Sequence, residues 1–208
     1  MGNGQDPDNN LYWGWGLGIR TYFTKSREWK LVRKSKLPYP LLERIVYRHR
    51  SGQYYLVADA YDGRAMKDCL DRFLLGVSGR HKEVIREGQV TIGLGGNAKL
   101  LAFIGHNGLM DLSLQSSYPN TDKRKRDCII LACYSKHYFS PYIKQAGANP
   151  LLWISNLFGP EAYTLHDALS AYMKGENPAT IQTKAAAVYA KYTRCSVKAA
   201  KKLLITGW

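Results

Sequence analysis

Two continuous apolar runs dominate the hydrophobic pattern of the chain. The first, residues 100–104, leads into His106, and the second, residues 128–132, leads into Cys133. Runs of this length without polar alternation are typical of strands that are buried on both faces, as in a parallel sheet. Ligands bind such sheets beyond the carboxyl ends of the strands. We therefore expect two neighbouring parallel strands that bring His106 and Cys133 to one sheet edge.

The rest of the chain alternates between shorter strand patterns and amphipathic helix patterns. Strands are predicted over residues 29–32, 42–49, 54–60, 90–92 and 151–155, and the turn signal at residues 51–53 predicts a β-hairpin of the second and third of them. Helices are predicted over residues 11–24, 64–75, 138–145, 160–174, 179–192 and 195–204. This alternation favours an α/β fold, here a three-layer α/β/α sandwich around a mostly parallel sheet. No repeat, linker or low-complexity tract divides the chain, so residues 1–208 are expected to form a single domain.

The composition is that of a folded protein with a strongly basic surface. The hydrophobic fraction is 45%, the charged fraction is 22% and the net charge is +14. Such a charge attracts acidic partners. No nucleic-acid-binding motif occurs among the basic residues, so nucleic acid is kept as a partner but is not favoured. No apolar stretch reaches the roughly 18 residues of a membrane span, so no membrane partner is expected.

The cysteine pattern argues against a metal site. Cys69, Cys128, Cys133 and Cys195 form no Cys-x-x-Cys pair, so neither zinc nor another cofactor is predicted. A reducing compartment is the simplest setting for them, and the N-terminus lacks a signal-peptide core, so we expect a cytoplasmic protein. The glycine run at residues 93–96 matches no phosphate-loop pattern and is interpreted as a turn, which leaves an NTP-binding protein as the weakest hypothesis.

A thiol beside an imidazole is the minimum for thiolate chemistry. His106 would take the proton of Cys133, and the resulting cation would stabilise the thiolate. The alternative is that Cys133 is a small buried apolar residue and that His106 belongs to a turn. Both residues stand at the ends of the apolar runs and not within them, which favours the dyad.

These two blocks resemble the caspase-like (clan CD) cysteine peptidases. In that family a hydrophobic strand ends in His-Gly, and a later hydrophobic strand ends in Ala-Cys or a similar pair. Ala132 and Cys133 match the second block, whereas Asn107 stands between His106 and Gly108 in the first.

The resemblance implies a caspase-hemoglobinase-like α/β domain that acts as a cysteine endopeptidase on a peptide or protein substrate. It implies that Cys133 is the nucleophile and that His106 is the base. It also implies an oxyanion hole formed by the backbone N–H groups of Cys133 and of Asn107 or Gly108.

Three charged residues near the end of a predicted strand are candidates for substrate binding. Asp59 and Asp62 would favour a basic residue before the cut bond, and Arg64 would favour an acidic one. The alternative for all three is helix capping or a surface ion pair. The basic run at residues 123–126 is either an exposed processing site or, as we favour, a solvated charge run.

The family fold opens with a strand before its first helix, and the polar residues 1–10 do not supply one. We therefore expect that this strand is lost or that a second chain completes the sheet. The competing function is a caspase-like fold without catalysis, which binds nucleic acid or an acidic partner through its basic surface.

Overall fold

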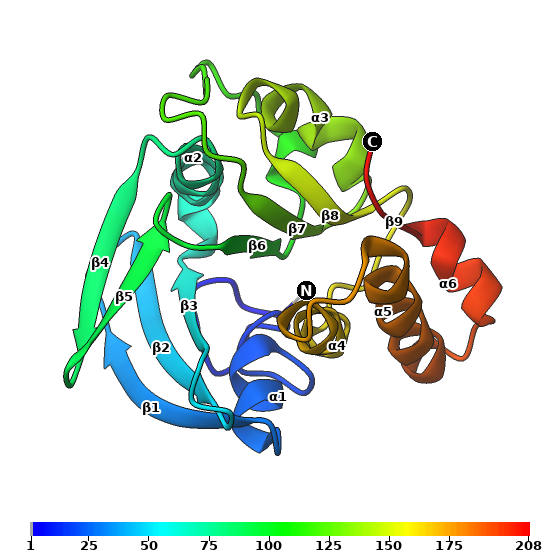
Figure 1. Ribbon diagram of the computed structural model, residues 1–208, viewed down its shortest axis with the longest axis horizontal. Helices are drawn as coiled ribbons and strands as arrows, with labels where there is room; N and C mark the ends of the chain where they lie inside the picture. Colours follow the sequence, from blue (N-terminus) through cyan, green and yellow to red (C-terminus); the bar gives the residue numbers. More distant parts are fainter. Residues whose placement is uncertain (1) are drawn as a thin grey trace.

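The computed structural model describes residues 2–208 and shows a mixed α/β fold (Figure 1). The strands are β1 (Trp29–Lys36), β2 (Leu41–His49), β3 (Tyr55–Tyr61), β4 (Lys82–Glu87), β5 (Val90–Gly95), β6 (Leu100–Ile104), β7 (Asp127–Leu131), β8 (Asn149–Ile154) and β9 (Leu204–Ile205). The helices are α1 (Ile19–Lys25), α2 (Met66–Val77), α3 (Ser135–Gln145), α4 (Ala162–Met173), α5 (Pro178–Thr193) and α6 (Val197–Leu203). Two short 3-10 turns, η1 (Gly63–Ala65) and η2 (Gly108–Met110), precede α2 and follow β6.

Both apolar runs belong to one four-stranded sheet. Its order is β6-β7-β8-β9, in which β6, β7 and β8 run parallel and β9 is antiparallel to β8. The residues from Cys128 to Leu131 in β7 are fully buried. The prediction that the strands leading to His106 and Cys133 are parallel neighbours is therefore confirmed.

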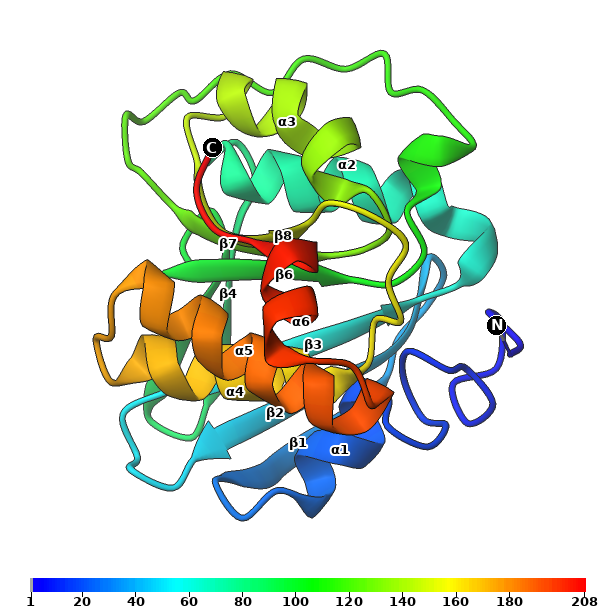
Figure 2. The same cartoon turned by 90° about the vertical axis from the view of Figure 1, so that its right-hand side faces the viewer.

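Helices lie on both faces of this sheet. α2 and α3 cover one face, and α4 and α5 cover the other (Figures 1 and 2). Along β7, Cys128 and Ile130 pack into the core cluster on the α2–α3 side, whereas Ile129 and Leu131 pack into the cluster on the α4–α5 side. Successive strand residues point to opposite faces, so a strand between two helical layers requires an unbroken apolar run.

The first half of the chain forms antiparallel pairs, and the hairpin predicted around residues 51–53 is present as β2 and β3. β1, β2 and β3 form a separate sheet in that order, and β4 and β5 form a hairpin. The prediction of a mostly parallel sheet is therefore correct only for the β6–β9 sheet. Only residues 50–54 connect β2 to β3, and a parallel pair would need a crossover of a dozen or more residues.

The N-terminal helix is much shorter than predicted. α1 covers Ile19–Lys25, and residues 11–18 form a series of turns. Gly16 has a φ of 53°, and a side chain on Gly18 would collide with the backbone of Trp13. These glycines therefore serve tight turns and a close backbone approach, which a continuous helix would not need.

Candidate active site

The two candidate catalytic residues follow the carboxyl ends of neighbouring strands, β6 and β7, at equivalent positions. Ile104 pairs with Leu131, and the N–H of Gly105 donates to the carbonyl of Leu131 at 3.2 Å. His106 and Cys133 each follow two residues after the Ile104–Leu131 pair. Both residues therefore leave the same edge of the sheet from neighbouring strands. Among the described residues no hydrogen bond joins their side chains, because Nε2 of His106 contacts Asp111 and the Sγ of Cys133 contacts Phe158.

Asn107 connects the two loops that carry these residues. Its side chain is buried, and its Nδ2 donates to the carbonyl of Cys133 at 2.7 Å. Its Oδ1 accepts the N–H of Leu109 at 3.1 Å. The residue that separates His106 from Gly108 thus fixes the cysteine loop against the histidine loop.

The half-buried thiol of Cys133 lies beside the segment that follows β8. The N–H of Phe158 donates to its Sγ at 3.3 Å, and the Sγ lies 3.4 Å from the carbonyl oxygen of Phe158. Tyr134 then adopts the left-handed conformation, with a φ of 50° and a ψ of 26°, so that α3 begins at once. Non-glycine residues rarely adopt this conformation, and such residues cluster at functional sites. The thiol therefore sits next to a helix N-terminus, where negative charge is favoured.

His106 contacts a carboxylate that the sequence pattern did not single out. Its Nε2 lies 2.5 Å from Oδ2 of Asp111, which follows η2 and donates its N–H to the carbonyl of Gly108 at 3.0 Å. A carboxylate on one imidazole nitrogen orients the ring and leaves the other nitrogen for a nucleophile. The signal in the sequence is an acid five residues after the histidine, which is too common on protein surfaces to be diagnostic.

The backbone groups expected in the oxyanion hole differ in their contacts. The N–H of Gly108 donates to the carbonyl of His106 at 3.1 Å, so it is already engaged. Asn107 and Cys133 are held in place by the amide–carbonyl hydrogen bond between them. Their N–H groups are the pair that we retain for the oxyanion hole.

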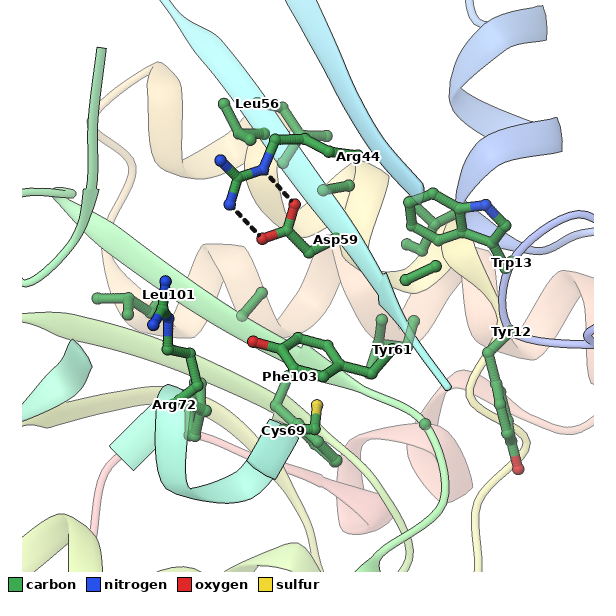
Figure 3. Close-up of a pocket in the computed structure, with 18 of the residues that line it drawn as sticks. Tyr12, Trp13, Arg44, Leu56, Asp59, Tyr61, Cys69, Arg72, Leu101 and Phe103 are labelled. Carbon is green, nitrogen blue, oxygen red and sulfur yellow. Dashed lines mark hydrogen bonds and ion pairs between the residues drawn. The ribbon is translucent and has the colours of Figure 1, made fainter. Parts of the chain in front are cut away.

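The three candidates for substrate binding take part in ion pairs. Asp59 accepts two hydrogen bonds from Arg44, at 2.6 and 2.8 Å (Figure 3). Asp62 caps η1 by accepting the N–H of Arg64. The Arg64 guanidinium also donates to Asp62 at 2.7 Å, and this lowers the pKa of the Asp62 carboxyl. All three residues therefore form ion pairs, and Asp62 also caps a helical turn. These are the roles that were the alternative to substrate binding.

A cavity of about 510 Å³ lies between β3 and β6, and we name it the β3–β6 groove. Residues 55–62 line one side of the groove and residues 100–106 line the other, so that one end reaches His106. Figure 3 shows Tyr61, Cys69 and Phe103 gathered on the α2 side of this space.

The other three cysteines differ from Cys133 in their surroundings. Burial raises the pKa of Cys69 to about 12 and also raises the pKa of Cys128. Cys195 is exposed, and all four cysteines are free thiols. Cys195 is therefore the thiol that would compete with Cys133 for an added reagent.

The basic run before β7 is only partly exposed. Residues 123–125 are exposed, but Arg126 is buried and donates from Nε to the carbonyl of Gly96 at 2.9 Å. The Arg126 guanidinium also donates to Asp122 at 2.6 Å. Together with Lys82 it lowers the pKa of Asp122. The prediction that the whole run is exposed is therefore wrong at Arg126, which anchors the loop.

A second histidine takes part in a hydrogen-bonded chain at the end of α1. Nε2 of His166 lies 2.8 Å from Oγ of Ser26, and Nδ1 lies 2.9 Å from Oδ1 of Asp167. The Ser26 Oγ also accepts the N–H of Glu28 at 3.1 Å. The Ser26 hydroxyl thus stabilises the turn after α1. We interpret the whole hydrogen-bonded series as a structural link between α1 and α4.

Among the described residues, no helix is both long enough and apolar enough to cross a membrane. No protein-family model, curated protein or solved structure matches the chain.

Proposed function

We propose that the protein is a caspase-like cysteine endopeptidase in which Cys133 is the nucleophile and His106 is the general base. The observation that carries this proposal is the parallel, in-register pairing of β6 with β7, which brings both residues to one sheet edge. Asn107 supports it, because its side chain holds the two loops together at 2.7 Å.

The proposed reaction is acyl transfer to a thiolate. His106 takes the proton of Cys133, and the Sγ attacks the carbonyl carbon of a peptide bond. Asp111 orients the imidazole and stabilises its charged form. The N–H groups of Asn107 and Cys133 would bind the oxyanion. His106 then protonates the leaving amine, and water hydrolyses the acyl-enzyme with His106 as base.

The arrangement of the elements supports the caspase-like part of the proposal. The histidine strand precedes the cysteine strand, and helices lie on both faces of their sheet. β8 runs parallel to β7, and the segment after it reaches the thiol at Phe158. We propose on this basis that the chain is a single domain with three α/β/α layers.

The proposed substrate is a peptide or protein. A preference for a basic residue before the cut bond would require the substrate cation to replace Arg44 at Asp59 or Arg64 at Asp62. Arg64 is exposed and would be the easier of the two to displace.

A panel of fluorogenic peptides with arginine, lysine or aspartate before the cut bond tests the proposal, at pH 6 to 8 with a reductant. We expect turnover that Cys133→Ala abolishes and that His106→Ala lowers by about 10³-fold or more, because the pair acts as a unit. Cys195→Ala is the matched control and should keep full activity. If no peptide is cut and Cys133 reacts with an alkylating reagent no faster than Cys195, the proposal fails.

The second candidate function is a non-catalytic binding protein for nucleic acid or an acidic partner. It is favoured by the net charge of +14 and by the exposed edge strand β1, where Lys30, Arg33 and Lys34 are exposed. Arg33 and Lys34 already pair with Glu87 and Glu43. Lysines also protect edge strands from pairing. Salt-sensitive binding of an oligonucleotide to the Cys133→Ala protein, together with no peptide cleavage by the wild type, would support this function.

A further inference from the structure

The β3–β6 groove is bordered by two strand edges that have no strand partner among the described residues. β3 is the last strand of the β1-β2-β3 sheet, and β6 is the first strand of the β6–β9 sheet. Both strands line the cavity along their whole length. Ala102 at the centre of β6 is exposed, although β7 beside it is buried. The groove therefore has a strand edge on each side.

The backbone of β6 presents hydrogen-bonding groups to the groove. The N–H of Gly105 donates to Leu131 in β7. Backbone groups of successive strand residues point to opposite sides, so Leu101, Phe103 and Gly105 face β7. The N–H and C=O groups of Ala102 and Ile104 then face the groove.

The backbone of β3 does the same from the opposite side. The N–H of His49 donates to the carbonyl of Tyr54 at 2.9 Å, which makes these two a hydrogen-bonded pair of the antiparallel ladder. Hydrogen-bonded pairs recur at every second residue, so Leu56 and Ala58 face β2. The backbone groups of Val57 and Asp59 face the groove.

Apolar side chains line both faces of the groove, and charged side chains are added on the α2 side only. Cys69 and Phe73 of α2 line it on one face, and Leu165 and Leu169 of α4 line it on the other. A strand that lies between two apolar layers must carry apolar side chains on both of its faces. An ion-pair network of Arg44, Asp59, Arg72 and Glu83 lies on the α2 side.

We propose that the β3–β6 groove binds an extended apolar segment of another polypeptide, which enters as a strand and pairs with both β3 and β6. The two rows of backbone groups specify an extended peptide, because a lipid or other apolar small molecule would leave them unpaired. The charged residues on the α2 side are paired with one another, so the apolar lining of both faces specifies a segment of about six residues with mainly apolar side chains in both directions. Filling the groove would join the two sheets into one.

The described residues do not contain a spare segment of this kind. Residues 2–10 reach the groove, where Gly2, Gly4 and Asn10 line it, but they are polar. The apolar strands β7 and β8 are already paired on both sides. A partner chain is therefore the occupant that fits.

The experiment uses a synthetic peptide of six alternating valine and isoleucine residues flanked by glutamates, titrated into the Cys133→Ala protein so that cleavage cannot interfere. We expect saturable binding of one peptide per chain by calorimetry. The backbone amides of Val57, Ala102 and Ile104 should gain protection from hydrogen exchange. The matched control peptide carries proline at its third and fifth positions, which removes ladder donors, and it should not bind.

Two edge variants locate the binding. Ala102→Pro and Val57→Pro each remove an N–H that faces the groove and leave the β6–β7 and β2–β3 hydrogen bonds in place. Each should weaken the binding of the peptide by about tenfold, because one backbone hydrogen bond to the peptide is lost and the proline ring blocks the strand edge. Ala102→Ser and Val57→Thr keep the N–H and should bind as the parent does.

The proposal is overturned if the peptide binds without protecting these amides, or if the proline variants bind it as well as the serine and threonine controls. It is also overturned if the protein associates with itself through these edges, as shown by a concentration-dependent mass that either proline variant abolishes. A failure here leaves the His106–Cys133 proposal intact, because that proposal rests on the opposite edge of β6, where it pairs with β7.

Discussion

Asn107 carries the geometry of the candidate site at the scale of single residues. Its amide joins the carbonyl of Cys133 to the N–H of Leu109, so one side chain sets the position of both loops. The sequence shows it only as an extra residue between His106 and Gly108. Asp111 is similar, because its contact with His106 depends on η2, which the sequence pattern does not predict.

We predict that Asn107→Ala lowers the free energy of unfolding by about 1–3 kcal/mol, because the carbonyl of Cys133 and the N–H of Leu109 lose a buried partner. It should also slow every reaction of Cys133, since the two loops lose their link. Urea unfolding and the rate of iodoacetamide labelling measure the two effects. Asn156→Ala, on the neighbouring loop after β8, serves as the control. An unchanged free energy of unfolding in Asn107→Ala would show that the hydrogen bonds of the Asn107 side chain do not stabilise the fold.

The structural elements differ in how readily the sequence predicts them. β7 and β8 are predicted well, because burial on both faces requires a continuous apolar run. β4 alternates between exposed and half-buried positions, so its pattern lacks that signal. β9 has two residues, too few for any periodicity, and its position depends on packing against β8. The groove between β3 and β6 depends on how two sheets meet, which local pattern does not encode.

The stability that the loop before β7 contributes should depend on pH in the acid range. Arg126 and Lys82 lower the pKa of Asp122, so the folded state holds its charge to lower pH than the unfolded state does. The stabilisation is then fully present above about pH 5 and is lost as the pH falls towards the lowered pKa.

The test of this element is Asp122→Asn, compared with the parent by thermal unfolding at several pH values. We predict a lower melting temperature for the variant at pH 7 and a difference that shrinks steadily below pH 5. Asp68→Asn, at an exposed position in the first turn of α2, is the control for a carboxylate that forms no ion pair among the described residues. A difference between parent and Asp122→Asn that stays constant down to pH 3 would exclude the ion pair as its cause.

The whole molecule combines a buried parallel core with an open side. β7 and β8 lie between two helical layers and between paired strands, whereas β6 is paired on one edge only. Native-state hydrogen exchange should follow this order. We predict that the amides of Ile129, Ile130 and Trp153 exchange only through global unfolding, whereas those of Ala102 and Ile104, which face the groove, exchange much faster and without global unfolding. Equal protection along β6 and β7 would contradict the open edge.

The central claim is that His106 activates Cys133, and the labelling of Cys133 by iodoacetamide as a function of pH tests it most directly. The measurement uses the Cys195→Ser protein, with and without His106→Ala, and mass spectrometry to locate the label. An ordinary thiol is almost entirely protonated at pH 6 and reacts slowly there. The account predicts that Cys133 is labelled rapidly at pH 6 and that His106→Ala slows this labelling by about tenfold or more. Equal labelling rates with and without His106 at pH 6 would contradict it.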